Sequence, residues 1–507
     1  MSEPIQQSGA EQTGGFNKVQ SILWPIHGHE LKKFLPISLL MFCIVFVYAM
    51  ISNIKDVFVQ KYAVCGGTEL IPVLKLWFVM PFALLTVILF TWLINKFGST
   101  KTFYIMTTIF LVFFAVFVLF LFPNAHLLHV SATKIRAMQR TWPRFLFYVI
   151  PCLTNWCYTL FYMFAEVWGV LSLYSLFWQF AGRVTKKSEA RRFYGLYTII
   201  ASLGVILSGG ILRKMSRVSG TAFDLNVKIL IGISVFFGLA AMVIFYGINK
   251  FVLKGQNFYT PNDKTNSKKR ETTVLNGLKI LFTSPYFGLI AILILGYGIA
   301  INFIEVMWKE QMRATLTNAN EYSNMMGNFS VIAGILTILI TILSTNILRR
   351  FKWKIGALIT PTIMLIVGVI LFTVIIYGKN GGNNLFGVRI PIFTIWIGLF
   401  ANALAWAVRY CLFDSTRMIT YRPLDQDAKT KGQAAVEVIG SCASNAGTSG
   451  ITHVFTNVVL FGSKLTAHIY TIVPIFIIAI AAWIAAVFGL GKKYENKVTE
   501  AENNNLD

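Results

Sequence analysis

The stretch YFGLIAILILGYGIAINFIEV, from Tyr286 to Val306, contains a single charged side chain, Glu305. A helix rises about 1.5 Å per residue, so roughly 20 apolar residues cross about 30 Å of hydrocarbon. Twelve such stretches fill the chain between Phe34 and Gly489. They predict an all-α polytopic membrane protein with twelve transmembrane helices, at 34–53, 70–95, 102–123, 145–175, 193–212, 229–249, 286–306, 323–347, 355–377, 390–413, 433–461 and 467–490.

The composition agrees with this prediction. Hydrophobic residues make up 56% of the chain and charged residues only 13%, which leaves no ordinary soluble domain. The longest polar insert, at about 253–273, is too short for a catalytic domain. A net charge of +24 would suit nucleic acid in a soluble protein, but here it is typical of basic loops that fix membrane orientation. We therefore expect a surrounding lipid bilayer, no nucleic acid and no obligatory protein partner.

Lys and Arg are unevenly distributed among the loops. With the N-terminus in the cytosol, the cytosolic segments hold more Lys and Arg than the outer loops, so we expect both termini to be cytoplasmic. The outer loops are still basic, which fits either attraction of an anionic solute or contact with lipid headgroups. The predicted divisions are a tail with an interfacial segment (1–33), an N-terminal six-helix half (34–252), a cytosolic linker (253–285), a C-terminal six-helix half (286–490) and a cytosolic tail (491–507).

The chain carries no pattern typical of an enzyme centre. Its six cysteines are scattered without a CxxC pair and its six histidines are sparse, so we expect neither a disulfide framework nor a metal site. There is no GxxxxGK[ST] phosphate loop and no Ser/His/Asp or Cys/His arrangement. These features favour a transporter driven by a gradient or by exchange over a pump or an enzyme, and we expect no cofactor.

Two segments of the chain resemble each other. Tyr, Asn, an acid and Val recur at the same offsets, as Tyr48, Asn53, Asp56 and Val57 in the first segment and as Tyr297, Asn302, Glu305 and Val306 in the second. Six stretches separate the two segments, and an even number keeps the same orientation in the membrane. The pattern predicts a parallel repeat of two six-helix halves with a central cavity between them.

Ionisable side chains within the stretches are the main candidates for function. A charge at mid-bilayer costs about 2.5–3.5 kcal/mol on insertion scales, so such residues usually face a cavity or a partner. Cations suit a solute that bears phosphates, whereas acids suit proton coupling or a counter-charge in the empty site. The alternative is an ion pair that only fixes the packing. We predict phosphate contacts from Lys55, Lys75 and Arg409, and coupling or gating roles for Glu166, Glu305, Asp56, Asp414 and Glu437.

Other polar residues are candidates for weaker roles. Asn155, Trp156 and Tyr158 in the fourth stretch could contact a planar base, with core packing as an equal alternative. Asn445 is a further candidate for a base contact. For Lys309, a position at the membrane interface is an additional explanation of its charge.

Short motifs along nearly the whole chain resemble one known family, the ATP/ADP translocases of obligate intracellular bacteria and plastids, which includes nucleotide transporters of chlamydia-like symbionts. The resemblance implies a fold similar to the major facilitator type, nucleotides as substrates, and transport roles for Lys55, Glu166 and Glu305. The motifs are Leu23-Trp24-Pro25-Ile26, Glu30-Leu31-Lys32-Lys33-Phe34, Lys55-Asp56, Pro72 with Lys75 and Trp77, Ala165-Glu166 with Trp168-Gly169, 176–180, 189–194, Glu305-Val306 with Trp308-Lys309, 412–414, 421–425 and 431–435.

The chain departs from this family at three basic positions. Ser52, Cys442 and Asn445 stand where the resemblance leads us to expect Arg or Lys. Fewer fixed cations suit a nucleotide/proton symporter, because protons accompany the anion. We therefore predict a secondary transporter that imports nucleoside di- or triphosphates across a bacterial inner membrane with protons.

Several alternatives stay open at this point. ATP/ADP exchange is the alternative within nucleotide transport. A peptide or drug transporter and a membrane-bound lipid-modifying enzyme are less favoured, since neither explains the motifs. The sequence leaves open the preferred base, the phosphate number, the direction, the stoichiometry and the oligomeric state.

Overall fold

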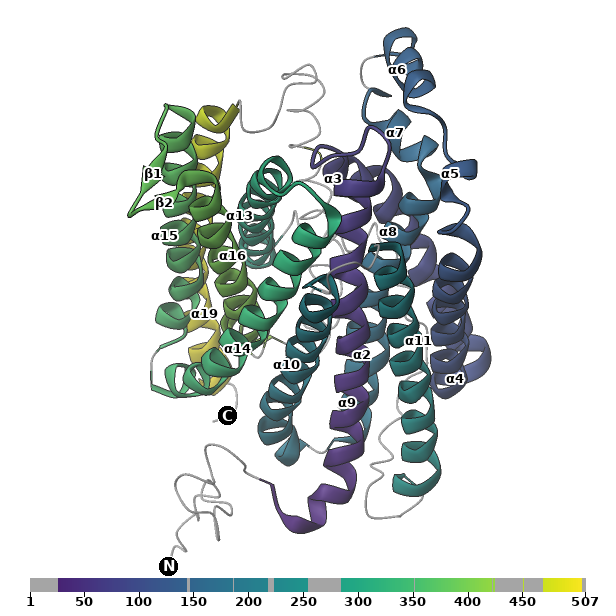
Figure 1. Ribbon diagram of the computed structural model, residues 1–507. Coiled ribbons are helices and arrows are strands. Elements are labelled where there is room, and N and C mark those ends of the chain that lie inside the picture. The colour runs from purple at the N-terminus through teal and green to yellow at the C-terminus, as the bar shows by residue number, and fades with distance from the viewer. Residues whose placement is uncertain are drawn as a thin grey trace, which may run out of the picture.

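The computed structural model describes residues 26–143, 146–185, 187–217, 223–253, 284–350, 352–421, 423–424, 450 and 468–503. These residues form a bundle of long helices (Figure 1). Within them, ten helices are long and apolar enough to cross a membrane: Leu31–Tyr62, Leu70–Leu121, Trp156–Gly182, Arg192–Arg217, Phe223–Val252, Pro285–Thr315, Ala319–Ser344, Trp353–Lys379, Ile390–Thr420 and Ile469–Glu500.

The predicted spans agree with these helices, apart from three details. The second and third spans lie in one segment, Leu70–Leu121, which Gly98 breaks with a φ of 74° and a ψ of 166°. Glycine adopts this backbone readily because it has no Cβ, so it separates two crossings. In the fourth span, Asn155 interrupts the first turns. Apart from Gly450, the predicted span 433–461 lies outside the described residues, so the count of twelve stays a prediction.

The N-terminal half starts with a short 3-10 turn, η1 (Gly28–Glu30), followed by the helix α2 (Leu31–Val57). Several of its helices continue into wider, π-type turns, which also carry the label η. The remaining elements are η2 (Phe58–Tyr62), α3 (Leu70–Val73), η3 (Leu74–Val79), α4 (Met80–Val116), η4 (Phe117–Leu121), α5 (Ala125–Leu128), α6 (Ala132–Thr141), α7 (Val149–Thr154), α8 (Trp156–Gly169), η6 (Val170–Trp178), α9 (Gln179–Val184), α10 (Lys187–Arg217), α11 (Phe223–Gly247) and η7 (Ile248–Val252).

The C-terminal half has the same helical character and one short hairpin. Its strands β1 and β2 pair antiparallel between α15 and α16. The elements are α13 (Pro285–Thr315), α14 (Ala319–Arg350), α15 (Trp353–Lys379), β1 (Asn384–Leu385), β2 (Val388–Arg389), α16 (Ile390–Val408), η8 (Arg409–Phe413), α17 (Asp414–Thr420) and α19 (Ile469–Asn503).

Each half is built around its first helix. In the N-terminal half, α2 packs against α8, α10 and α11, and its Phe34 and Phe46 are fully buried. In the C-terminal half, α13 packs against α16 and α19, where the rings of Tyr297 and Trp483 lie 6.0 Å apart. A helix that is apolar all round suits such a central position. In Figure 1, α2 begins and α19 ends at the lower end of the bundle.

The two halves meet along α10 and α14, which lie side by side in Figure 1. Facing glycines allow the two backbones to approach closely. A Cβ on Gly209 would lie 2.6 Å from the carbonyl oxygen of Gly327, whereas a Cβ on Gly210 would meet nothing within 4 Å. The close approach is therefore confined to the face of α10 that touches the other half.

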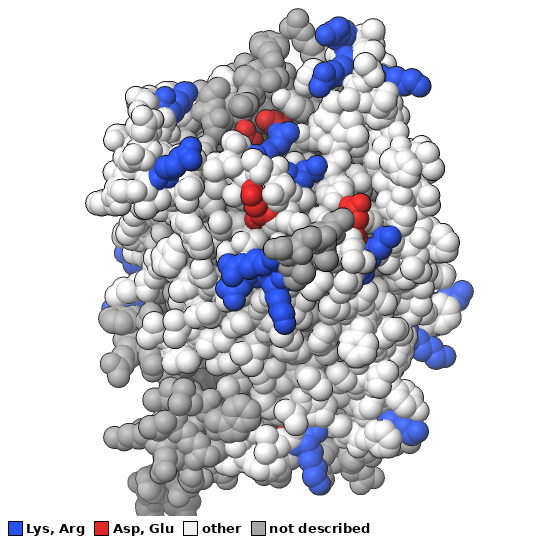
Figure 2. Space-filling model, in the orientation of Figure 1, with Lys and Arg blue, Asp and Glu red and all other residues white. Residues whose placement is uncertain are grey.

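The outer surface of the bundle is apolar. Ile88, Leu119 and Phe236 have exposed fractions of 65%, 65% and 66%. On the face shown in Figure 2, most of the surface is uncharged, and Lys and Arg are more frequent than Asp and Glu. Large exposed apolar side chains of this kind suit contact with lipid rather than with water.

Candidate functional site

The helices that carry the sequence repeat, α2 and α13, each contact the opposite half. The side-chain amide of Asn53 on α2 donates a 2.7 Å hydrogen bond to the hydroxyl of Ser330 on α14. Its repeat partner, Asn302 on α13, accepts a 3.1 Å hydrogen bond from the Lys75 ammonium on η3. Each Asn thus contacts the other half, while the parallel repeat itself stays a prediction.

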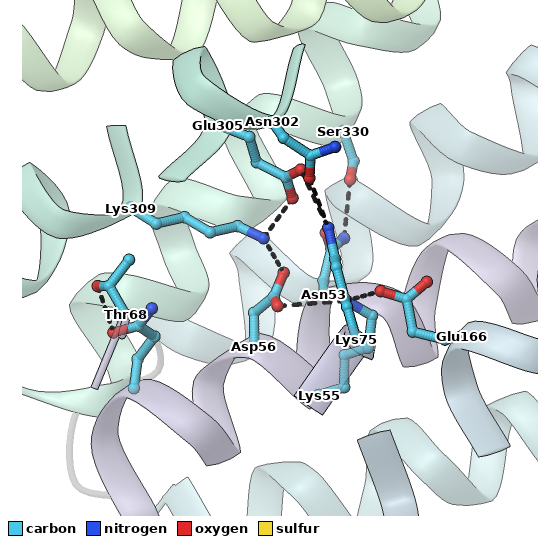
Figure 3. A network of polar contacts seen from close by, with 11 residues as sticks. Asn53, Lys55, Asp56, Thr68, Lys75, Glu166, Asn302, Glu305, Lys309 and Ser330 are labelled. Atoms are coloured by element: carbon cyan, nitrogen blue, oxygen red, sulfur yellow. Dashed lines mark hydrogen bonds and ion pairs between the residues drawn. The ribbon is translucent and has the colours of Figure 1, made fainter. Parts of the chain in front are cut away.

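Next to these contacts lies a cluster of buried charges that joins the halves (Figure 3). At its centre, the Lys309 ammonium on α13 lies 2.8 Å from Asp56 on α2 and 2.5 Å from Glu305, one turn earlier on its own helix. We call the full set the lysine–acid cluster; it comprises Lys55, Asp56, Lys75, Glu166, Glu305 and Lys309.

Two more lysines complete the cluster from the N-terminal half. Lys55 on α2 lies 3.2 Å from both Asp56 and Glu166, and its ammonium stands 4.4 Å from the ring centre of Tyr162. Lys75 lies 3.6 Å from Glu305 on α13. The links from Lys75 to Glu305 and from Asp56 to Lys309 both cross between the halves, so the cluster ties them together.

The cluster is buried and electrically balanced. The side chains of Lys309 and Asp56 are only 2% and 3% exposed, whereas those of Lys75 and Glu305 are 15% and 28% exposed. Its three ammonium groups face three carboxylates, which offsets the cost of taking each charge out of water. Lys75 is the most exposed of the three lysines.

Wide helical turns hold two of the basic candidates. Lys75 lies in η3 and Arg409 begins η8. Such turns add a residue to the helix, redirect side chains and occur often at functional sites. The Arg409 guanidinium carbon lies 5.2 Å from the ring centre of Tyr297 and 5.6 Å from that of Tyr410. Arg409 thus packs on aromatic faces, and it makes none of the ion pairs that define the lysine–acid cluster.

A second set of contacts joins the halves where η2 meets the end of α13. Arg313 pairs with Glu69 at 3.3 Å and donates a hydrogen bond to the carbonyl oxygen of Gly66. Lys61 donates to the carbonyl oxygens of Arg313 at 3.3 Å and Leu316 at 2.6 Å. A cation is favourable at a helix C-terminus, where the carbonyl groups carry partial negative charge. We call this set the end clamp.

At the opposite end, two ion pairs join elements of the N-terminal half. Lys33 contacts Glu189 at 2.7 Å, and Arg192 contacts Glu30 at 2.6 Å, so both pairs join the start of α2 to α10. Burial acts to raise the pKa of Glu30, but the His27 backbone N–H and the Arg192 guanidinium outweigh it, and the pKa lies below its usual value. Glu30 therefore keeps its charge at neutral pH, and the pair with Arg192 is retained.

The remaining charged candidates lie apart from this cluster. Asp414 pairs with Arg417 at 3.0 Å on α17. Glu437 and Asn445 lie outside the described residues. Among the residues that the structure describes, no group of three or more His, Cys, Asp and Glu could hold a metal ion.

The three residues of the fourth span that were predicted to contact a base are Asn155, Trp156 and Tyr158. The Asn155 side chain accepts a 2.9 Å hydrogen bond from the Val64 N–H and donates one of 2.9 Å to the Val64 carbonyl oxygen. Tyr158 stacks on Phe58 with ring centres 5.2 Å apart, inside the N-terminal core. Trp156 is 38% exposed. The structure does not bring these side chains to the lysine–acid cluster, and their contacts match the packing alternative.

Lys309 is the central residue that the sequence-based site prediction left out. A position at the membrane interface seemed sufficient to explain its charge, yet the residue is 2% exposed. The available signal was its spacing: Lys309 follows Glu305 by four residues, so both side chains lie on one helix face and can pair.

A bundle of membrane-crossing helices with a cluster of buried charges at its centre is typical of secondary transporters. Residues 9–494 match the family model described as TLC ATP/ADP transporter, and the chain belongs to this family. This match confirms the family resemblance. It also confirms the predictions that the protein is a multi-pass membrane transporter and that it is not an enzyme.

Curated relatives cover nearly the whole chain. It is 35% identical to ADP,ATP carrier protein 1 of Chlamydia pneumoniae over 94% of this chain and 94% of that protein. It is 34% identical to ADP,ATP carrier protein 1 of Rickettsia bellii over 96% of this chain and 98% of that protein.

Solved structures confirm the predicted fold class. A D-xylose-proton symporter matches with a TM-score of 0.56 at 14% identity, over 91% of this chain and 97% of that one. A bacterial homologue of the iron transporter ferroportin, in an inward-facing state, matches with a TM-score of 0.53 at 10% identity, over 92% and 100%. These likenesses support the major facilitator architecture and nothing about the substrate.

Proposed function

We propose that this protein exchanges nucleotides across the membrane, with ATP and ADP as its substrates. The observation that carries the proposal is the balanced lysine–acid cluster, in which Asp56–Lys309 and Lys75–Glu305 link the two halves. A polyanionic phosphate chain is the kind of ligand that competes with carboxylates for lysine. The relatives in Chlamydia and Rickettsia, described as ADP,ATP carrier proteins, support the choice of substrates.

The links between the halves favour exchange. The lysine–acid cluster and the end clamp both connect the two halves. Phosphate oxygens that bind Lys75 and Lys309 weaken the links to Glu305 and Asp56, and so lower the cost of rocking one half against the other. An empty protein keeps these links and does not reorient. Net import is then slow, and each nucleotide that enters requires one that leaves.

Proton-coupled import is the second candidate function. The sequence favoured it because Ser52, Cys442 and Asn445 stand where the family resemblance leads us to expect cations. It needs a carboxyl group that gains and loses a proton, and Glu305 and Glu166 were the sequence-based candidates. Glu305 lies within 2.5 Å of Lys309 and 3.6 Å of Lys75. A proton on Glu305 would leave the buried cluster with an uncompensated positive charge, which is costly away from water. This charge balance favours exchange over proton coupling.

The deciding experiment uses the purified protein in liposomes with labelled ATP outside. Liposomes preloaded with ADP should take up label rapidly, empty liposomes should take up little, and a proton uncoupler should change neither result. Uptake into empty liposomes that the uncoupler abolishes would instead support proton-coupled import.

We further propose that the protein lies in a bacterial inner membrane with both termini in the cytoplasm, because its Lys and Arg residues favour that orientation. The end clamp, at the end of the bundle away from the start of α2, then faces the outside. A variant with Lys268→Cys should react with a membrane-impermeant thiol reagent only after the membrane is opened, in a background that lacks other reactive cysteines. Labelling of intact cells would contradict this orientation.

A further inference from the structure

We propose that the nucleobase of the substrate stacks between Tyr48 on α2 and Trp406 on α16, below the phosphate-binding lysines. This inference rests on the proposed nucleotide exchange. It gives the base a site distinct from Asn155 and Tyr158, which have structural partners elsewhere, and from the exposed Trp156.

The two rings form an aromatic pair across the halves. Tyr48 and Trp406 lie 6.2 Å apart between ring centres and are nearly parallel, with an interplanar angle of 22°. Both side chains are partly exposed. The edge of Trp406 is supported by Phe329 at 6.2 Å and Tyr410 at 5.4 Å. Parallel aromatic faces are the usual binding partners of a planar base, because every base has a π-face.

The distance between the Tyr48 and Trp406 rings suits a base-binding site that opens when the two halves move apart. Carbon atoms in contact lie about 3.5–4.0 Å apart, so a base between two rings needs about 7 Å or more. The present 6.2 Å falls slightly short. Since α2 and α16 belong to different halves, a small movement between the halves admits a base. A bound base would in turn hold the two halves at a defined separation.

Tyr48 is fixed in its orientation by a glycine on the neighbouring helix. A Cβ on Gly169, at the end of α8, would overlap the Tyr48 ring. The ring therefore lies close to the backbone of α8 at Gly169 and nearly parallel to the ring of Trp406. A pre-set ring of this kind loses little conformational freedom when a ligand binds.

The distance from this pair to the lysines fits an extended nucleotide. Tyr48 lies seven positions before Lys55 on α2, which corresponds to about 10 Å along the helix. The ribose and phosphate chain of a nucleotide can bridge such a gap. Arg409, three positions after Trp406, lies 5.6 Å from the ring centre of Tyr410, which in turn packs on Trp406. Base and phosphates would thus bind at different levels of the same interface between the halves.

The test separates base binding from phosphate binding. We expect Tyr48→Leu and Trp406→Leu to weaken ATP binding about 10- to 100-fold, because stacking on one aromatic ring contributes roughly that factor. Tyr48→Phe and Trp406→Phe keep a ring and should retain most of the affinity. Tripolyphosphate, which has no base, should compete equally well with labelled nucleotide in all four variants and in the wild type. Lys75→Gln should weaken ATP and tripolyphosphate alike.

A matched control is Trp396→Leu, which removes a 46% exposed tryptophan from the same helix and should change neither affinity. Thermal unfolding of each purified variant shows whether it is folded. Unchanged ATP affinity in both leucine variants would overturn the aromatic site while leaving nucleotide exchange intact. Equal losses for ATP and tripolyphosphate would also overturn it, since the rings would then only support the lysines. A wild-type protein that binds no nucleotide would instead refute the proposed function.

Discussion

Replacing Lys309 by glutamine is expected to abolish nucleotide exchange and to lower the thermal stability of the protein. Lys309 lies between Asp56 and Glu305, and without it the buried Asp56 and the partly exposed Glu305 each lose one of their two ammonium partners. Removing one member of a buried ion pair costs about 3–5 kcal/mol, which corresponds to a factor of about 100 or more. The cluster would also carry a net negative charge, which repels phosphates.

A second variant separates stability from transport. Asp56→Asn combined with Lys309→Gln restores the charge balance, so this double variant should recover thermal stability but not exchange. Lys228→Gln, an exposed position on α11, is the matched control and should behave like the wild type. ATP uptake into ADP-loaded liposomes and thermal unfolding in detergent supply the two readouts. Wild-type exchange by the double variant would show that Lys309 only fixes the packing.

Much of the fold was predictable, because the bilayer imposes a simple requirement on each crossing. Long apolar stretches predicted the helices, and the break at Gly98 falls in the gap between the predicted spans 70–95 and 102–123. The interruption at Asn155 was not predicted, because an asparagine inside an apolar run is compatible with both a continuous and a broken helix. The repeat of Asn53 and Asn302 stays a prediction; both side chains contact the other half, Asn53 as a donor to Ser330 and Asn302 as an acceptor from Lys75.

The site was predictable in its chemistry and less so in its geometry. The cost of buried charge identified Lys75, Glu166 and Glu305, which lie together in the cluster. The same argument could not place Lys309, because a charge near the end of a span can reach water or a partner. Which face of a helix meets the other half is also hidden when the helix is apolar all round.

The base candidates illustrate the same limit. Asn155 and Tyr158 are polar residues in a span, and sequence alone cannot distinguish a ligand contact from a backbone partner such as Val64. Tyr48 and Trp406 become a pair only when α2 and α16 are placed next to each other. Their separation in the sequence leaves no local pattern from which the pair could be predicted.

Replacing Lys75 by glutamine is expected to lower nucleotide uptake strongly while membrane insertion stays intact. With a side chain 15% exposed, Lys75 is the most accessible lysine of the cluster, so it can meet a phosphate without first leaving a closed site. A hydrogen bond to a charged group contributes about 1.5–3 kcal/mol, or a factor of about 10 to 100 in affinity. Glutamine can still bind Asn302, which preserves the contact between the halves but removes the charge.

The size of the loss should depend on the phosphate chain and on the charge at this position. ATP should lose more affinity than AMP, because a longer chain reaches the lysines, and Lys75→Arg should retain part of the uptake because it keeps the positive charge. Initial rates of uptake at several nucleotide concentrations, together with the amount of inserted protein, give the comparison. An unchanged affinity in the glutamine variant would mean that Lys75 only neutralises Glu305, and the phosphates would then have to bind elsewhere along the interface between the halves.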